Sequence, residues 1–293
     1  MPILDKLDVL KSYPFSAGDI PEKVLMVSPD YYGVNYIINP HMKTESGELP
    51  VVDEQRAKFQ WEKLKAKIEE IGLKVSVLGG QEGLPDMVFS ANQILPLDSK
   101  RVLASRMATK ERSNEVEYLV NFFKNHGLEV KELPSCIERF EGTGDGIWHH
   151  GMELLWVGHG PRTSYKAIEF LGMDLDLPVV PLELIDENFY HLDTCFAIMD
   201  SRTVVWTPKA FSPKSQKLID KFFPRTIEIP YEEAKEAFSC NCWSVDGKNV
   251  IVPVNTPILQ QKLENHGFVV HEVDTSEYLK SGGSVFCLKL AYF

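Results

Sequence analysis

One recurring pattern restricts the fold of this chain more than any other feature: a helix-like run, a glycine or proline stop, then a short apolar strand. Four copies are clear and a fifth is degenerate, and they read IEEIGLKVSVL (residues 68–78), FKNHGLEVKEL (123–133), DKFFPRTIEIP (220–230), KLENHGFVVHEV (262–273) and EFLGMDLDLPVVPL (169–182). A single unit of this kind cannot bury its own apolar face, so repeated units stack on their neighbours. The pattern therefore favours a solenoid, a propeller or a closed array.

The last repeat along the chain, which is the fifth in sequence order, shows the layout of one unit most clearly. Strands are expected over residues 241–245 and 249–253, joined by an Asp-Gly hairpin signal. A helix then begins at Pro257, with Thr256 as its cap, and ends at Gly267. The fourth repeat has the same layout, with strands over 194–199 and 203–207 and a helix opened by Ser212 and Pro213. Each repeat is therefore interpreted as a ββαβ module.

The helix expected in the first repeat has one apolar face. Its apolar residues follow one another at spacings of four, three, four and three, which is the period of an amphipathic α-helix. They are Ala57, Trp61, Leu64, Ile68 and Ile71.

One strand, expected over residues 284–290, follows the fifth repeat without a module of its own. A spare terminal strand is what a circular array needs to pair its two ends and remove exposed edges. We therefore predict an α/β fold in which five ββαβ modules form a five-bladed propeller closed by the C-terminal strand. Length alone would allow two domains, but the repeats favour one domain over residues 1–293.

Composition excludes several classes of protein. The net charge of −11 disfavours a nucleic-acid binder, which needs a basic face. An acidic cavity would suit a cationic small molecule, although net charge usually reflects a solvated surface. No stretch approaches the ~18 apolar residues of a membrane helix, and the N-terminus lacks the pattern of a signal peptide. The chain is therefore expected to be cytoplasmic, without a membrane partner.

The five cysteines have no framework spacing, and reduced cytoplasmic thiols are the simplest interpretation. Cys240 and Cys242 would point to opposite faces of the expected strand, so they cannot easily bind one ion together. We expect neither a metal nor a cofactor.

Circular symmetry would bring the starts of the first strands of successive modules around one axis. Polar, titratable residues occupy these positions and would make poor core residues. A shared site is therefore favoured over a set of caps and turn formers. The residues are 86–92, 141–145, 191–193 and Asn241, with Cys287 added by the spare strand.

Six segments carry a resemblance to a known family. They are LPDMVFSANQ (84–93), RFEGTGD (139–145), GPRTS (160–164), YHLDTCF (190–196), CNCWSVDGKNVIVP (240–253) and SGGSVFCLKL (281–290). In this order they resemble the guanidino-modifying pentein superfamily, which includes arginine deiminases, dimethylarginine dimethylaminohydrolases, arginine dihydrolases and amidinotransferases. The resemblance extends from about Val24 to the C-terminus.

The resemblance implies a cysteine nucleophile, because a guanidinium carbon is a poor electrophile and a soft thiolate can add to it. Cys287 matches that nucleophile; the alternative is a buried structural cysteine. His191 matches the general acid and base, and Glu141 the carboxylate that orients it. The usual E-G-G-D is E-G-T-G-D here, which leaves open whether Glu141 or Asp145 faces His191. Glu141 is favoured, with Asp145 lining the substrate pocket.

Asp193 lies two residues from His191 and would share a strand face with it. This H-x-D pair resembles deiminases and dihydrolases, in which the carboxylate binds guanidinium nitrogens, and it favours unmethylated arginine. Asn92 stands where deiminases have an aspartate. An amide can donate to a ureido oxygen, which resembles the dihydrolase branch that converts arginine through citrulline to ornithine. The alternative is a simple loss of affinity for arginine.

Four further residues are candidates for binding the substrate. Arg162 matches the family position that holds the α-carboxylate, and Arg112 resembles a second such arginine more loosely. For Arg112, a helix-surface arginine is almost as good an interpretation. Asp86 is expected to contact the substrate or hold a loop, and Asn39 is a weaker pocket candidate.

Together these residues predict a metal-independent hydrolase that acts on arginine or a related guanidino compound through a covalent amidino-thioether. One alternative is an amidinotransferase, because the covalent half-reaction is common to both. The other is a binding module, since a ribosome-binding anti-association factor shares this architecture. A homodimer is the general expectation for such enzymes.

Overall fold

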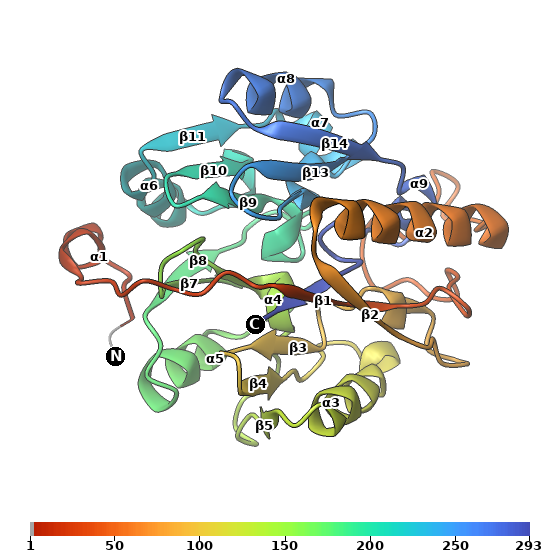
Figure 1. Cartoon of the computed structure of the whole chain (residues 1–293), viewed down its shortest axis with the longest axis horizontal. Helices are drawn as coiled ribbons and strands as arrows, with labels where there is room; N and C mark the ends of the chain where they lie inside the picture. Colours follow the sequence, from red (N-terminus) through yellow and green to blue (C-terminus); the bar gives the residue numbers. More distant parts are fainter. Residues whose placement is uncertain (1–2) are drawn as a thin grey trace.

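A computed structural model describes residues 3–293 and arranges its strands, within that range, in five sheets of three (Figure 1). The first sheet contains β15 (Leu290–Tyr292), β1 (Lys23–Val27) and β2 (Lys74–Leu78). The other four are β3 (Ile94–Pro96), β4 (Arg101–Ala104) and β5 (Glu129–Lys131); β6 (Gly146–Trp148), β7 (Leu155–His159) and β8 (Val179–Glu183); β9 (Phe196–Asp200), β10 (Thr203–Trp206) and β11 (Arg225–Glu228); β12 (Trp243–Ser244), β13 (Asn249–Pro253) and β14 (Val269–Val273).

A helix connects the last two strands of each sheet. These helices are α2 (Glu54–Ile71), α3 (Glu115–Asn125), α5 (Tyr165–Glu169), which continues as a π-turn over Phe170–Asp174, α6 (Pro213–Phe222) and α8 (Pro257–Asn265). Shorter helices lie outside the modules: α1 (Leu7–Ser12), α4 (Gly142–Asp145), α7 (Tyr231–Glu236) and α9 (Ser276–Leu279).

The strand pairings follow the predicted ββαβ rule. In the last sheet, β12 pairs antiparallel with β13, and β14 returns parallel to β13 after α8. The first sheet lacks a preceding strand of its own, and β15 takes that place by pairing antiparallel with β1, with Val24 opposite Ala291. The predicted pairing of the two ends of the chain is therefore confirmed.

Local sequence signals explain where the helices begin and end. Four of the five residues predicted for the apolar face of α2 are buried, and Ile71 at its end is half-buried. Pro257 opens α8, and Gly267 beyond its end has a left-handed φ of +86°, which glycine adopts without strain. Thr256 precedes α8, but its hydroxyl donates to the Pro253 carbonyl instead of capping the helix.

Several first strands are shorter than predicted. Residues 239–241 form a 3₁₀ turn where a strand was expected from residue 241, and Cys287 lies in a turn before β15 instead of inside a strand. Asn241 provides the physical reason. Its side-chain oxygen accepts the backbone N–H groups of Ser284, Phe286 and Cys287, and these bonds hold the segment in a compact turn.

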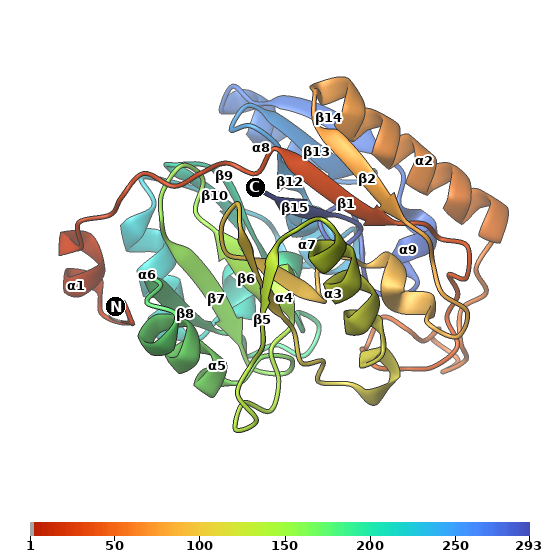
Figure 2. The same ribbon diagram turned by 60° about the horizontal axis from the view of Figure 1, so that its bottom comes forward.

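The largest apolar cluster lies between the sheets. Trp156 is fully buried and packs against Phe196, Phe222 and Phe223 at ring-centroid distances of 5.1 to 5.6 Å. Over residues 3–293 no helix combines the length and the apolar character needed to cross a membrane. In Figure 1, α4 and β15 lie near the middle of the molecule with the sheets around them, and Figure 2 shows the same central position from a second direction.

Candidate active site

A small cavity with about 260 Å³ of empty space lies near this middle. Most of the side chains singled out from the sequence line it, including Cys287, Asn92 and Asp86. Its complete lining is Ile38, Asn39, Met42, Asp86, Phe89, Asn92, Arg112, Arg162, Tyr190, Ser281, Gly283 and Cys287. Two of these residues lie on 3₁₀ turns: Asp86 on Pro85–Val88 and Arg112 on Lys110–Arg112.

Cys287 is buried and its thiol has two polar neighbours. Its Sγ donates to Oδ2 of Asp193 at 3.2 Å and accepts from Nδ2 of Asn241 at 3.2 Å. Burial raises the pKa of the Cys287 thiol well above its usual range, and the charge of Asp193 raises it further. Cys287 is therefore a neutral thiol that is hydrogen-bonded to the side chain of Asp193.

Glu141 and His191 form a buried pair. Nε2 of His191 lies 2.6 Å from Oε2 of Glu141, which also accepts from Arg162 at 3.2 Å, while Oε1 accepts the Ala108 N–H at 2.8 Å. These contacts outweigh burial and lower the pKa of Glu141 to about 2, whereas burial lowers the pKa of His191 to about 4. The carboxylate is therefore ionised, Nε2 carries the proton, and Nδ1 is free to act as a base.

The one-residue insertion in E-G-T-G-D is accommodated in α4. Thr143 donates its hydroxyl to the Ala91 carbonyl at 2.8 Å, and Glu141, not Asp145, faces His191. The expectation that Asp145 lines the substrate pocket is wrong. Its carboxylate accepts from the Thr163 hydroxyl at 2.6 Å and from the Leu192 N–H at 3.0 Å, so it holds two chain segments together.

Two carboxylates near the cavity have unused acceptor oxygens. Within the described residues, Oδ1 of Asp193 has no hydrogen-bond partner. Neither oxygen of Asp86 has one of ordinary geometry, although the Tyr36 hydroxyl interacts with it. Burial is the main cause that raises the pKa of both groups, to about 7 for Asp193. Such buried acceptors suit a ligand that brings hydrogen-bond donors and positive charge.

The predicted reason for placing Asp193 beside His191 is wrong. Neither side chain is among the lining residues of the cavity; Asp193 contacts the lining residue Cys287, and His191 shares Glu141 with the lining residue Arg162. Leu192–Thr194 is a 3₁₀ turn, so the two side chains do not share a strand face. Asp193 reaches the site because this turn directs its carboxylate to Cys287.

Asn92 presents an amide donor. Its Oδ1 accepts from Nη1 of Arg112 at 2.8 Å, and an arginine can only donate, so the orientation of the amide is determined. Nδ2 is buried and has no partner among residues 3–293. The site therefore contains one unsatisfied N–H group beside the unsatisfied carboxylates.

Arg112 lines the cavity and is 4% exposed, so the helix-surface alternative is wrong, and contact with an α-carboxylate stays a prediction. Its guanidinium is occupied by Glu115, by Asn92 and by the backbone carbonyls of Asp86 and Phe89. Arg112 is therefore a positioning residue. The i,i+3 spacing of Arg112 and Glu115 is the signal that could have identified this buried partner. Burial raises the pKa of Glu115 to about 7 against the opposing effect of Arg112.

Arg162 is only partly occupied. Nη1 contacts Glu141, Nη2 donates to the Ile38 carbonyl at 2.8 Å, and the guanidinium carbon lies 5.0 Å from the centre of the Tyr190 ring. It lines the cavity and remains a candidate for an anionic substrate group. Asn39 also lines the cavity, where its amide donates to the Ser281 carbonyl at 3.0 Å.

Comparison with known proteins gives consistent similarities. A family model described as N,N dimethylarginine dimethylhydrolase, eukaryotic, matches residues 29–293. The bifunctional arginine dihydrolase/ornithine cyclodeaminase ArgZ of Synechocystis is 38% identical over 275 residues, which cover 94% of this chain and 38% of ArgZ. The N(G),N(G)-dimethylarginine dimethylaminohydrolase of Mycobacterium tuberculosis is 35% identical over 265 residues, which cover 90% of this chain and 84% of that protein.

The fold is similar to a solved structure as well. The N-terminal domain of ArgZ, in a variant covalently bound to a reaction intermediate, matches with a TM-score of 0.85 at 36% identity, covering 92% of this chain and 97% of that domain. This chain spans only 38% of full-length ArgZ, so the comparison concerns that domain.

Proposed function

This chain belongs to the family described as N,N dimethylarginine dimethylhydrolase, eukaryotic, and from that premise we propose that it hydrolyses the guanidino group of arginine or a close derivative. One observation carries the proposal. A cysteine thiol, unsatisfied carboxylate oxygens and an amide donor converge on one buried cavity. The carboxylate oxygens match a cation that carries hydrogen-bond donors, and the Asn92 N–H matches a ureido oxygen.

Substrate binding follows from the unused acceptors. The guanidinium would donate to Asp86 and to Oδ1 of Asp193, which have no other partners of ordinary geometry among the described residues. Paired hydrogen bonds between a carboxylate and a guanidinium are strong and directional. Methyl groups on the guanidinium would remove donors from such pairs, so unmethylated arginine is the preferred substrate. Arg162 is the candidate for the α-carboxylate.

Cation binding would also activate the nucleophile. Burial raises the pKa of Cys287 most, and the charge of Asp193 raises it further. A guanidinium beside Asp193 would offset the second of these two effects. Sγ then adds to the guanidino carbon, and the thiol proton passes to the neutral His191. His191 gives that proton to the departing nitrogen, which leaves as ammonia and leaves an amidino-thioether on Cys287.

The second half of the cycle would use the same base. His191 is neutral again and takes a proton from water, whose oxygen adds to the amidino carbon. The carbon–sulfur bond then breaks, His191 returns its proton to sulfur, the remaining hydroxyl proton passes to solvent, and the ureido product citrulline leaves. Glu141 holds the ring of His191 in place and stabilises its protonated form.

Asn92 supports a second cycle. Citrulline carries a carbonyl oxygen in place of one guanidino nitrogen, and that oxygen needs a donor. Nδ2 of Asn92 is a buried donor without a partner within residues 3–293, and Arg112 prevents the amide from turning over. We therefore favour the dihydrolase branch, in which citrulline and water give ornithine, a second ammonia and carbon dioxide.

Three further expectations, on the closure of the fold, the cellular compartment and the oligomeric state, are part of this proposal. The five sheets would form a closed five-bladed propeller with the cavity on its axis, since β15 pairs with β1 and the sheets surround α4. The five free cysteines fit a reducing, cytoplasmic environment. We also expect a homodimer, because two-fold dimers are the commonest soluble oligomers.

Product analysis tests the proposal. Purified protein and its Cys287→Ala variant are incubated with arginine, citrulline, dimethylarginine and agmatine, and ammonia, dimethylamine, citrulline and ornithine are measured. Ornithine from arginine, lost in the variant, is the expected result. Turnover that appears only when an amine acceptor is added would identify an amidinotransferase instead, and no turnover of any compound would favour a binding module.

A further inference from the structure

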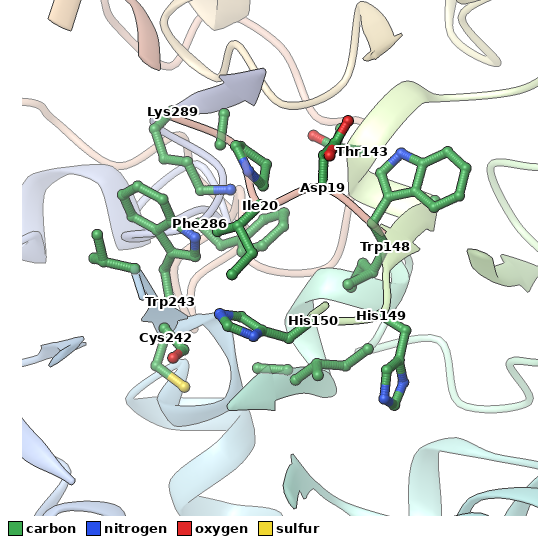
Figure 3. A pocket seen from close by; sticks show the side chains of 18 residues that line it. Asp19, Ile20, Thr143, Trp148, His149, His150, Cys242, Trp243, Phe286 and Lys289 are labelled. Carbon is green, nitrogen blue, oxygen red and sulfur yellow. The ribbon is translucent and has the colours of Figure 1, made fainter. Parts of the chain in front are cut away.

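A second cavity lies apart from the catalytic one and shares no lining residue with it (Figure 3). It encloses about 730 Å³ of empty space, which includes its open mouth. Strands β6, β9, β12 and β15 contribute to its walls, and Ile20 and Pro21 of the N-terminal segment cover part of it. It is larger than the catalytic cavity and has no part in the mechanism above.

Lys289 is the unusual member of its lining. The residue is 2% exposed, and within the described part of the chain its ammonium group makes neither a hydrogen bond nor an ion pair that meets ordinary distance limits. Instead Nζ lies over two aromatic rings, 3.2 Å from the centre of Phe286 and 4.9 Å from that of Trp243. The charges of Asp193 and Cys287 act on this ammonium, but neither group forms an ion pair or hydrogen bond with it. A buried ammonium with no anion in contact is costly, so an anion in contact with it would be stabilising.

His150 supplies a second unsatisfied polar atom. It lines the same cavity, and its Nε2 is buried without a hydrogen-bond partner among residues 3–293. Figure 3 shows the side chain of Lys289 and the ring of His150 reaching into the cavity from different sides. Burial lowers the pKa of both groups, to about 7 for Lys289. A bound anion would therefore gain a proton-donating partner at Lys289 and a neutral donor at His150.

The remaining lining determines what kind of anion fits. Trp148, Trp243, Phe286 and Ile198 present mainly apolar surface, which favours a ligand with an apolar or planar body. Asp19 is the single carboxylate among the lining residues, and it lies on an exposed segment. It disfavours a second negative charge, so a monoanion fits better than a phosphate monoester.

We propose that this cavity binds a small organic monocarboxylate, whose carboxylate pairs with Lys289 and whose apolar body packs against Trp243 and Phe286. Lys289 follows Cys287 by two residues, and its N–H donates to the Phe286 carbonyl at 3.4 Å. A ligand on Lys289 therefore contacts the same turn that carries the nucleophile. The proposed site is separate from the catalytic cavity and shares no lining residue with it.

Calorimetric titration with benzoate tests the proposal, and benzyl alcohol serves as the neutral probe of the same shape. Benzoate should bind saturably to the wild type, and benzyl alcohol about tenfold more weakly or worse, because one charge-assisted hydrogen bond is lost. Lys289→Met should weaken benzoate binding by about tenfold or more, whereas Lys289→Arg should retain it. Equal affinities of wild type and Lys289→Met for benzoate would overturn the proposal.

A second arm locates the bound probe and does not depend on the stability of the Lys289 variants. Cys287→Ala is saturated with arginine, so that the catalytic cavity is filled, and benzoate is then added. Binding should persist and change the fluorescence of the pocket tryptophans, Trp148 and Trp243. Displacement of benzoate by arginine, or no saturable binding to the wild type, would refute the second site. If arginine itself does not bind, the proposed function fails while the benzoate result still decides this inference.

Discussion

Replacing Asn92 with aspartate tests the electrostatic basis of the proposed second cycle. The carboxylate keeps an acceptor for Arg112, which donates to Oδ1 at 2.8 Å. It also replaces the unpartnered Nδ2 donor with an acceptor, beside the carboxylates of Asp86 and Asp193. The structure therefore predicts opposite effects on a cationic guanidinium and on a neutral ureido group.

The magnitude follows from the single hydrogen bond that changes. A hydrogen bond to a charged or developing charged group contributes about 1.5–3 kcal/mol, which corresponds to about 10- to 150-fold in rate. We expect kcat/KM for citrulline in Asn92→Asp to fall by at least that factor, because repulsion adds to the lost bond. Arginine should still be converted, so citrulline accumulates in place of ornithine.

Amino-acid analysis of time courses with arginine and with citrulline measures both effects. Asn92→Leu is the matched control, since it removes the donor without adding charge and should lose citrulline turnover as well. Ornithine formation by Asn92→Asp at the wild-type rate would refute the argument that the Asn92 amide serves the ureido oxygen.

Three further predictions concern the nucleophile, the histidine and the buried ion pair. Cys287→Ala should abolish turnover and the covalent adduct in quenched mass spectra while still binding arginine by calorimetry; an adduct in that variant would place the nucleophile elsewhere. In the folded protein the pKa of His191 is lowered from 6.5 to about 4, so its contribution to stability is present above pH 6.5 and is lost as the pH falls towards 4. Wild-type melting temperatures should therefore decline more steeply over that pH range than those of His191→Asn. Parallel curves would contradict the assignment. Arg112→Met should lower the free energy of unfolding by about 3–5 kcal/mol in urea titrations, since it leaves the buried Glu115 without its ion-pair partner. Adding Glu115→Gln to that variant should restore part of the loss. An equal loss in the double variant would show that the ion pair is not the cause.

Most of the fold could be predicted because its signals are local. The apolar spacing within α2 and the proline and glycine that bound α8 each act within one helix. The first strands could not be bounded in this way. Asn241 turns the chain at residues 284–287 through bonds that join positions more than forty residues apart, and no local pattern reports them.

The candidate site was predicted less completely than the fold. The resemblance of six motifs to the guanidino-modifying pentein superfamily singled out Cys287, His191 and Asn92. Sequence could not show that Asp145 bonds Thr163 away from the cavity or that Arg112 is consumed by Glu115. Both facts depend on the direction of a side chain after its module has packed against the next.

By itself, the sequence determined the repeated ββαβ unit, the pairing of the last strand with the first, and the residue types available for chemistry, because periodicity and chain-breaking residues act over short distances. Only the tertiary structure decided which atoms face the cavity. Asn92 presents its N–H because Arg112 holds its oxygen, and the Lys289 ammonium lies against the Phe286 and Trp243 rings instead of in a hydrogen-bonded ion pair. Such outcomes are set by contacts between modules, where burial removes water as an alternative hydrogen-bond partner.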